Sequence, residues 1–214
     1  MTALPQHIGA VLFDMDNTLV SSEHAWSAAT DDLWQNAGPA QRGADVLGGS
    51  TADIIDEFMD AHPGADPAAA EQRFMELLHV RLTEGVMTMP GATELLGRLA
   101  LTVPLAIASN SPSIIVSDMV TRMGWDDVFT IAVGTDDVAR GKPAPDLYLA
   151  AARGCGVEPE TCVVVEDSPV GAAAGKAAGA FVLTVGAAGA GHGDAHAASL
   201  TDPLVLAWEP GQLP

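Results

Sequence analysis

Polar and charged side chains follow several short apolar runs of this sequence, where buried strands would end. They are the side chains of Asp14, Asp16, Ser109, Asn110, Lys142, Glu166 and Asp167. In open α/β sheets, ligands bind beyond the carboxyl ends of the strands, where residues from different strands meet. One aspartate after a strand is typical of a turn or a helix cap. Acidic, basic and neutral groups from four segments instead indicate one reaction site.

The acidic residues of this set indicate a divalent cation. Residues i and i+2 of a strand point to the same side, so Asp14 and Asp16 would face one pocket. Close carboxylates repel one another unless a cation lies nearby, and Glu166 and Asp167 add to the repulsion. Hard oxygen ligands without a nearby His or Cys suit Mg²⁺. The sequence therefore predicts Mg²⁺ as the cofactor.

Lys142 is the candidate source of positive charge at this site. The formal net charge of the chain is −19, and Lys142 and Lys176 are its only lysines. Because an acidic surface repels an anionic substrate, the site of such a substrate needs local positive charge. Pro143 and Pro145 restrict the backbone beside Lys142 and favour a fixed loop.

Hydrogen-bond donors for a phosphoryl group follow the second predicted strand of the sheet. The Ser109 hydroxyl and the Asn110 amide are candidates to bind phosphoryl oxygens. The backbone N–H groups of Ser111 and Ser113 are further candidates, because they lie near a helix start. These donors lie beside acidic and basic candidates, which favours a phosphate site.

Two different periodicities divide the chain. From residue 90 onward, helical and strand-like patterns alternate, which is typical of a parallel sheet with helices on both faces. The predicted strands are 8–14, 103–110, 128–134, 161–167 and 180–186, and the predicted helices are 91–100, 112–124, 144–156 and 169–179. Residues 186–198 are rich in Gly and Ala and predict a solvated loop.

Residues 20–87 interrupt this alternation after the first strand. Apolar residues recur there at spacings of three and four, which predicts helices over 24–38, 51–62 and 67–86. Asp66 and Pro67 are typical of an N-cap and a first helical residue. We expect an α/β fold, with a Rossmann-like parallel sheet core at 1–19 and 88–214 and an inserted helical bundle domain at 20–87.

Composition limits the classes of protein that fit. Hydrophobic residues make up 48% of the chain and charged residues 17%, which favours a buried core over disorder. No apolar run approaches the roughly 20 residues that span a bilayer, and the first residues lack a signal-peptide pattern, so we expect a cytoplasmic protein. The acidic surface argues against partners such as nucleic acid or a membrane.

Two further residue pairs are weaker candidates for chemistry. Cys155 and Cys162 are too few for a disulfide framework and match no zinc motif, so we expect inert thiols. His192 and His196 lie four residues apart, but their segment lacks helix propensity, which disfavours a metal site.

Four motifs occur in the order that a known family shows. They are Asp14-Met15-Asp16-Asn17-Thr18 (DxDxT), Ser109-Asn110, Lys142 in GKPAPD, and Glu166-Asp167 in VVVEDSPVGAAAGKAAG. With these motifs the sequence resembles the haloacid dehalogenase superfamily, and the resemblance extends to about residue 186. It is strongest for the branch that contains β-phosphoglucomutase and sugar-phosphate phosphatases. The insertion at 20–87 matches the C1-type helical cap of this family in position and size.

The resemblance implies a role for each matching residue. Asp14 is expected to attack phosphorus and form an aspartyl-phosphate. Asp16 is expected to protonate the leaving oxygen and then to activate water. Thr18 is expected to brace the loop, and Ser109 and Lys142 to hold phosphoryl oxygens.

The resemblance also implies which residues hold Mg²⁺. The expected ligands are the Asp14 carboxylate, the Asp16 main-chain carbonyl and Asp167. Glu166 is expected either to bind the metal directly or to support its ligands.

Within this family, the expected activity is hydrolysis of a phosphate monoester. Family dehalogenases lack the second aspartate, because displacing halide needs no leaving-group acid, so Asp16 argues against them. The phosphonate-cleaving branch uses a cap lysine, and residues 20–87 contain none. A β-phosphoglucomutase-like mutase is the nearest alternative. Mutases place a His where this chain has Trp26, and basic residues where it has 46–50, so hydrolysis is favoured.

Two alternative functions belong to other classes of protein. A phospho-receiver signalling domain also accepts phosphate on an aspartate beside Mg²⁺, but such domains have no helical insertion after the first strand. A P-loop ATPase needs a GxxxxGK[ST] motif, which this sequence lacks.

The identity of the substrate is left open by the sequence. We expect a small phosphorylated metabolite, such as a sugar phosphate or phosphoglycolate, as the partner. Glu23 and Arg42 in the insertion are weak candidates for contact with it. For the oligomeric state we expect a monomer or a weak dimer.

Overall fold

A six-stranded parallel sheet forms the centre of the computed structural model, which describes residues 3–38 and 49–213. Its strands are β2 (Val11–Phe13), β3 (Leu105–Ala108), β4 (Ile131–Val133), β5 (Val163–Glu166), β6 (Phe181–Val185) and β7 (Ala195–Ala197). They lie in the order β4-β3-β2-β5-β6-β7, and each neighbouring pair is parallel. Strand β2 is therefore central, with the segments after β3 and β5 on either side of the residues that follow it.

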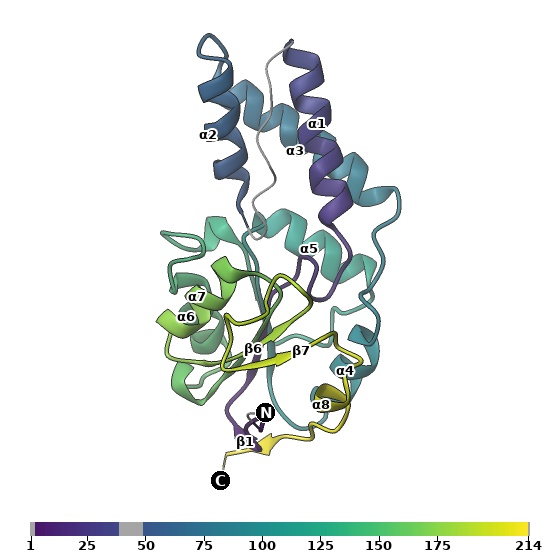
Figure 1. Cartoon of the computed structure of the whole chain (residues 1–214), viewed down its shortest axis with the longest axis vertical. Helices are drawn as coiled ribbons and strands as arrows, with labels where there is room; N and C mark the ends of the chain where they lie inside the picture. The colour runs from purple at the N-terminus through teal and green to yellow at the C-terminus, as the bar shows by residue number, and fades with distance from the viewer. Residues whose placement is uncertain (1–2, 39–48, 214) are drawn as a thin grey trace.

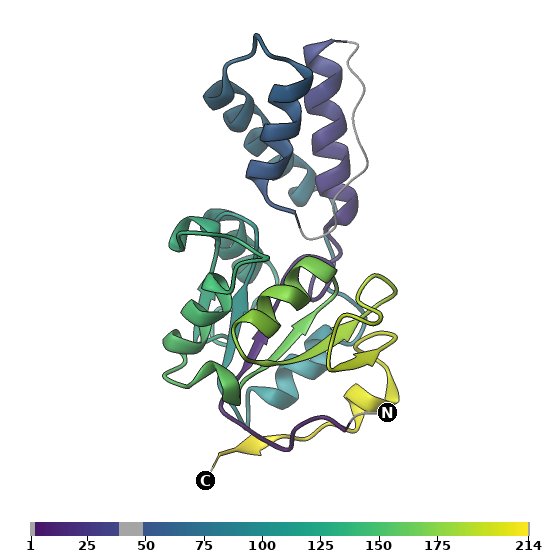
Figure 2. The ribbon, with the colours of Figure 1, turned by 60° about the vertical axis from the view of Figure 1, so that its left-hand side comes forward.

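Helices cover both faces of the sheet (Figures 1 and 2). They are α4 (Ala92–Leu99), α5 (Ser113–Arg122) and α8 (Pro203–Leu206) on one face, and α6 (Asp146–Gly154) and α7 (Pro169–Ala177) on the other. Alternate residues of β2 enter different cores, because Val11 and Phe13 pack with the first group and Leu12 with the second. The α/β fold with a parallel sheet is confirmed.

Three helices lie together beyond the carboxyl edge of the sheet (Figure 1). They are α1 (Glu23–Ala37), α2 (Thr51–Ala61) and α3 (Pro67–Thr83), called the cap helices below. As predicted, Asp66 caps α3: its carboxylate accepts the Ala68 N–H at 3.0 Å. The domain boundaries at 19/20 and 87/88 stay a prediction, although Val20 and Thr88 form an isolated antiparallel bridge. Arg42 and residues 46–48 lie outside the described residues.

The segment 186–198 differs from the expected loop. Its last part forms β7, which pairs with β6 in the register Thr184↔His196. Smaller elements that the sequence analysis missed are β1 (His7–Ile8), β8 (Gly211–Gln212), the short helix α8, and the 3₁₀ helices η1 (Thr135–Asp137) and η2 (Pro159–Thr161). Over 3–38 and 49–213, none of the helices has the length and apolar character needed to cross a bilayer.

Candidate active site

Asp14 lies where β2 ends, and its carboxyl group is almost fully buried. Its backbone N–H donates to the Val165 carbonyl of β5 at 2.9 Å, so the sheet itself fixes the residue. Oδ1 accepts from Nζ of Lys142 at 2.7 Å, whereas Oδ2 has no hydrogen-bond partner. Burial raises the pKa of Asp14 well above its ordinary value, and Lys142 opposes the shift. A buried oxygen without a partner is free for an electrophile or a cation.

Lys142 is held in place by Asn110. The Asn110 Oδ1 accepts the Lys142 N–H at 2.8 Å, and its Nδ2 donates to the Lys142 carbonyl at 3.4 Å. The peptide bond between Lys142 and Pro143 is cis. In this structure, Asn110 therefore braces the lysine loop, and its predicted contact with phosphate stays a prediction.

The ammonium group of Lys142 joins two buried carboxylates. Its Nζ lies 2.7 Å from Asp14 Oδ1 and 2.7 Å from Glu166 Oε1. Burial alone would lower the pKa of Lys142, but the charges of Asp14 and Glu166 and their hydrogen bonds raise it. The lysine therefore stays charged and partly offsets the acidic cluster.

Glu166 has hydrogen-bond donors on both oxygens. Oε1 accepts from Lys142 and from the Tyr148 hydroxyl at 2.8 Å. Oε2 accepts the Asp167 N–H at 3.1 Å, the Ser168 N–H at 3.0 Å and the Ser168 hydroxyl at 3.0 Å. A Cβ on residue 171 would lie 1.6 Å from Oε1, so glycine at this position makes room for the carboxylate. Glu166 thus positions Lys142, and its expected role as a metal ligand or as a support of the ligands stays a prediction.

Tyr148 was missed by sequence reasoning, because a tyrosine on the apolar face of a predicted helix resembles any core residue. It is fully buried in α6, and Nζ of Lys142 lies 4.9 Å from the centre of its ring. Burial and the charge of Glu166 raise the pKa of Tyr148, so its hydroxyl stays protonated and donates. We infer a supporting role in the lysine–glutamate pair.

Replacing Tyr148 by Phe is expected to lower the free energy of unfolding by about 1 kcal/mol, because Glu166 loses one buried donor. Urea denaturation at pH 7 measures this change. Thr18→Val is the matched control: Thr18 is fully buried and its hydroxyl has no hydrogen-bond partner, so the loss should be near zero. Equal effects of the two substitutions would contradict the role of Tyr148. The expected role of Thr18 in bracing its loop stays a prediction.

Asp16 is turned toward a different set of partners from Asp14. Its Oδ2 accepts from the hydroxyls of Ser109 at 3.0 Å and Ser111 at 2.8 Å. Its Oδ1 accepts from Ser22 and Trp26 at the start of the cap helices. The sequence pointed to Ser109, whereas Ser22, Trp26 and the Ser111 side chain carried no signal for this contact. Side chains of the core and side chains at the start of the cap helices thus donate to the same carboxylate, that of Asp16.

The backbone donors expected near the start of α5 are already used within the protein. The Ser111 N–H donates to Ser109 Oγ at 3.0 Å. The Ser113 N–H donates to Asp136 at 2.6 Å, and the Ser113 hydroxyl donates to Asp137 at 2.5 Å. The Ser109 hydroxyl and Lys142 contact the carboxyl groups of Asp16 and Asp14, and their binding of phosphoryl oxygens stays a prediction.

Asp14, Glu166 and Asp167 form a cluster that could hold a metal ion. One carboxylate oxygen from each lies within 4.8 Å of the others, and this is the one such cluster within 3–38 and 49–213. Burial and then the charge of Glu166 raise the pKa of Asp167 to about 7. The raised pKa values of Asp14 and Asp167 and the oxygen-only donor set fit a hard divalent cation. The Asp16 side chain, the Cys pair and the two loop histidines lie outside this cluster.

The cap candidates are less well placed than the core motifs. Glu23 is exposed as the first residue of α1, and its backbone N–H donates to Asn17 Oδ1 at 2.9 Å. Arg42 lies outside the described residues. Neither candidate gains a substrate role from the structure.

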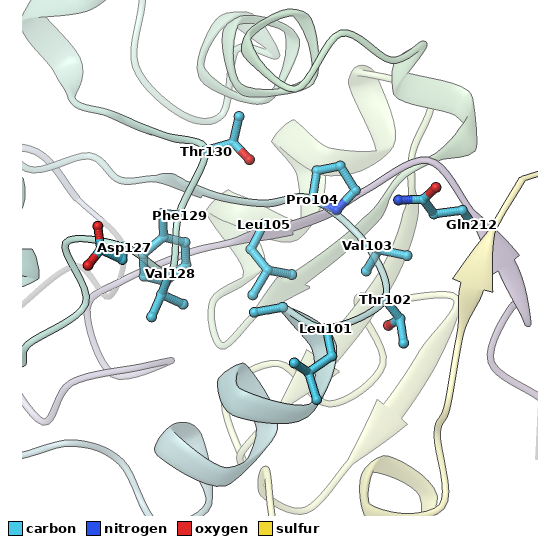
Figure 3. Close-up of a pocket in the computed structure, with 11 residues that line it drawn as sticks. Leu101, Thr102, Val103, Pro104, Leu105, Asp127, Val128, Phe129, Thr130 and Gln212 are labelled. Atoms are coloured by element: carbon cyan, nitrogen blue, oxygen red, sulfur yellow. The ribbon is translucent and has the colours of Figure 1, made fainter.

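A pocket of about 370 Å³ lies at the opposite end of the sheet, next to the amino ends of β3 and β4 (Figure 3). Pro104, Leu105 and Phe129 line it together with Asp127, its one charged residue. Ligands of parallel sheets bind at the carboxyl ends of the strands, and this pocket has no cluster of convergent polar groups. The acidic cluster, and not this pocket, is therefore the candidate active site.

Comparisons with known proteins identify the family of this chain. A family model described as a haloacid dehalogenase-like hydrolase matches residues 8–179. Hexitol phosphatase A of Escherichia coli is 36% identical over 186 residues, which cover 82% of each chain. Phosphoglycolate phosphatase of Neisseria meningitidis is 30% identical over 224 residues, covering 100% of this chain and 94% of that one. The crystal structure of CbbY from Rhodobacter sphaeroides in complex with phosphate shares the fold, with a TM-score of 0.78, 24% identity and coverage of 96% and 97%.

Proposed function

Because the chain belongs to the haloacid dehalogenase-like hydrolase family, we propose that it is a Mg²⁺-dependent phosphatase that hydrolyses a small phosphate monoester. The observation that carries the proposal is the state of Asp14: Lys142 holds one carboxylate oxygen, and the other is buried without a partner. This oxygen is available to attack phosphorus. The names of the relatives favour a sugar phosphate or a phosphoglycolate-like compound as the substrate.

The proposed reaction begins with attack by Asp14 Oδ2 on phosphorus. A bond forms between this oxygen and phosphorus, and the bond to the ester oxygen breaks. Asp16 gives a proton to the departing oxygen and later takes one from the water that hydrolyses the aspartyl-phosphate. Lys142 and the Ser109 hydroxyl are placed to hold the phosphoryl oxygens in both steps. The products are an alcohol and inorganic phosphate.

The acidic cluster is proposed to hold Mg²⁺ through Asp14 and Asp167, together with the Asp16 main-chain carbonyl that the family resemblance implies. A bound Mg²⁺ would offset the charge of the carboxylates and of the phosphoryl group. Glu166 is proposed to support this arrangement through Lys142, because donors already occupy both of its oxygens.

A panel of phosphate esters tests this proposal directly. We expect release of inorganic phosphate from hexitol phosphates or 2-phosphoglycolate with Mg²⁺, and loss of release with EDTA. Interconversion of glucose phosphates with a bisphosphate primer, without net release, would instead favour the mutase alternative. Stable labelling by acetyl phosphate, without turnover of any ester, would favour a phospho-receiver.

Stabilisation by Mg²⁺ is expected to grow between pH 6 and pH 8. The pKa of Asp167 is raised to about 7, so at pH 6 a metal must displace a proton from most molecules. Without metal, the contribution of Asp167 to the stability of the fold changes with pH in the opposite direction. A carboxyl group with a raised folded-state pKa stabilises the fold below its unfolded pKa, and this contribution is lost as the pH rises through about 7.

Thermal unfolding with and without Mg²⁺ at pH 6 and pH 8 measures this effect. Asp167→Asn should lose most of the shift at both pH values. A shift of equal size at pH 6 and pH 8 in the wild-type protein would contradict the pH dependence.

A further inference from the structure

The indole ring of Trp26 contacts Asp16 from the cap side. Trp26 lies in the first turn of α1, and its Nε1 donates to Asp16 Oδ1 at 3.1 Å. The Ser22 hydroxyl donates to the same oxygen at 2.6 Å. On the core side, Ser109 and Ser111 donate to Oδ2. The carboxyl group of Asp16 is therefore held at both oxygens, one from each part of the molecule.

The local structure around Ser22 is arranged for this contact and not for helix capping. Ser22 is the N-cap residue of α1, where a serine side chain normally accepts a backbone N–H of the first turn. Its hydroxyl makes no such capping bond, and the Glu23 N–H is accepted instead by Asn17 Oδ1 at 2.9 Å. Asn17 adopts a φ of 61°, a conformation that asparagine tolerates. The side chain of Asn17 thus caps the start of α1, and the Ser22 hydroxyl donates to Asp16 instead.

The ring of Trp26 is oriented by packing. It lies 5.7 Å from the ring of Phe74 in α3, measured between centroids. Trp34, two turns further along α1, makes a similar contact with Phe58 at 5.0 Å, but its Nε1 has no hydrogen-bond partner. The two tryptophans share a helix and an aromatic environment. They differ in whether the indole N–H is used.

We infer that Trp26 is a positioning residue for the acid/base Asp16, an inference that rests on the proposed phosphatase function. In the first step, protonated Asp16 gives a proton from Oδ2, whose serine partners can accept as well as donate, to the ester oxygen, and that oxygen keeps the electron pair of the broken P–O bond. Asp16 becomes a carboxylate at this moment, and the Trp26 N–H, together with Ser22, keeps its Oδ1 in place. Trp26 thereby links the orientation of α1 to leaving-group protonation.

The test compares Trp26→Phe with Trp34→Phe. Both substitutions keep an aromatic ring, but only the first removes a donor from Asp16. We expect Trp26→Phe to lower kcat/KM about tenfold for the best alkyl phosphate of the substrate panel. For 4-nitrophenyl phosphate, whose leaving group needs little protonation, we expect less than about a twofold loss. Trp34→Phe should affect both substrates equally.

Two further variants separate donation from packing. Trp26→Leu removes the donor with a side chain of different shape, and the same alkyl-selective loss is expected. In an Asp16→Asn background, Trp26→Phe should add no further selective loss, because asparagine has no proton to give. An additional alkyl-selective loss in the Asp16→Asn background would mean that Trp26 acts through a group other than Asp16.

The outcomes distinguish this inference from the proposed function. If wild-type protein is active and Trp26→Phe changes the alkyl-to-aryl ratio no more than Trp34→Phe does, the positioning role is overturned and the phosphatase function stands. If the wild-type protein hydrolyses no ester with Mg²⁺, the proposed function fails and the inference fails with it.

Discussion

Asp14→Asn is expected to reduce phosphate release by at least about 10⁴-fold while leaving the fold intact. Asparagine lacks the negative charge that makes Asp14 Oδ2 a nucleophile. Its amide oxygen can still accept the Lys142 ammonium, which now lies 2.7 Å from Oδ1. The substitution also removes one of several buried, mutually repelling carboxylates, so thermal stability without metal should be retained or raised.

Steady-state phosphate release and thermal unfolding measure these two effects. Asp127→Asn is the matched control, because Asp127 is exposed and lies at the opposite end of the sheet (Figure 3). Its activity should equal that of the wild-type protein. Retention of full activity by Asp14→Asn would remove Asp14 as the nucleophile, whatever the stability of the variant.

Asp16→Asn should lower turnover of alkyl phosphates by about 10²–10⁴-fold, because the leaving alkoxide no longer receives a proton. With 4-nitrophenyl phosphate, formation of the aspartyl-phosphate in the first step should slow much less. The surroundings of Asp16 tolerate this substitution, because serine hydroxyls can accept as well as donate. The amide group can point its carbonyl at Trp26, which only donates, and its NH₂ at Ser109 and Ser111.

Rates across a series of esters with different leaving groups check this expectation. The loss in Asp16→Asn should increase as the leaving alcohol becomes a weaker acid. Losses of equal size on alkyl and aryl phosphates would show that Asp16 acts in some way other than leaving-group protonation. Unfolding measurements on the same samples would show whether such a uniform loss reflects fewer folded molecules.

The parallel sheet could be predicted from the sequence because its central strands are buried on both faces. Short runs of Val, Ile, Leu and Ala, such as those in β3 and β5, have few alternatives in a chain of this size. β7 could not be predicted in this way. Its residues, Ala195, His196 and Ala197, have low strand propensity, and they become a strand because the edge of β6 offers unpaired backbone groups.

The sequence alone was enough to predict that the main candidate residues would meet at one edge of the sheet. Asp14 and Asp167 follow buried strands, Glu166 ends β5, and Lys142 lies in a proline-restricted loop. Their meeting at one edge of the sheet follows from the parallel topology. The same topology explains why Asp14 and Lys142, 128 residues apart, share a hydrogen bond.

Only the tertiary structure decided which hydrogen-bond partners these residues have. The structure gives Glu166 a full set of donors, leaves one oxygen of Asp14 without a partner, and places Tyr148, Ser22 and Trp26 beside carboxylates. Hydrogen bonds depend on distances and directions within a few tenths of an ångström. A sequence pattern shows which side chains reach the same edge of the sheet, but the packing of helices against that edge determines which oxygen meets which donor.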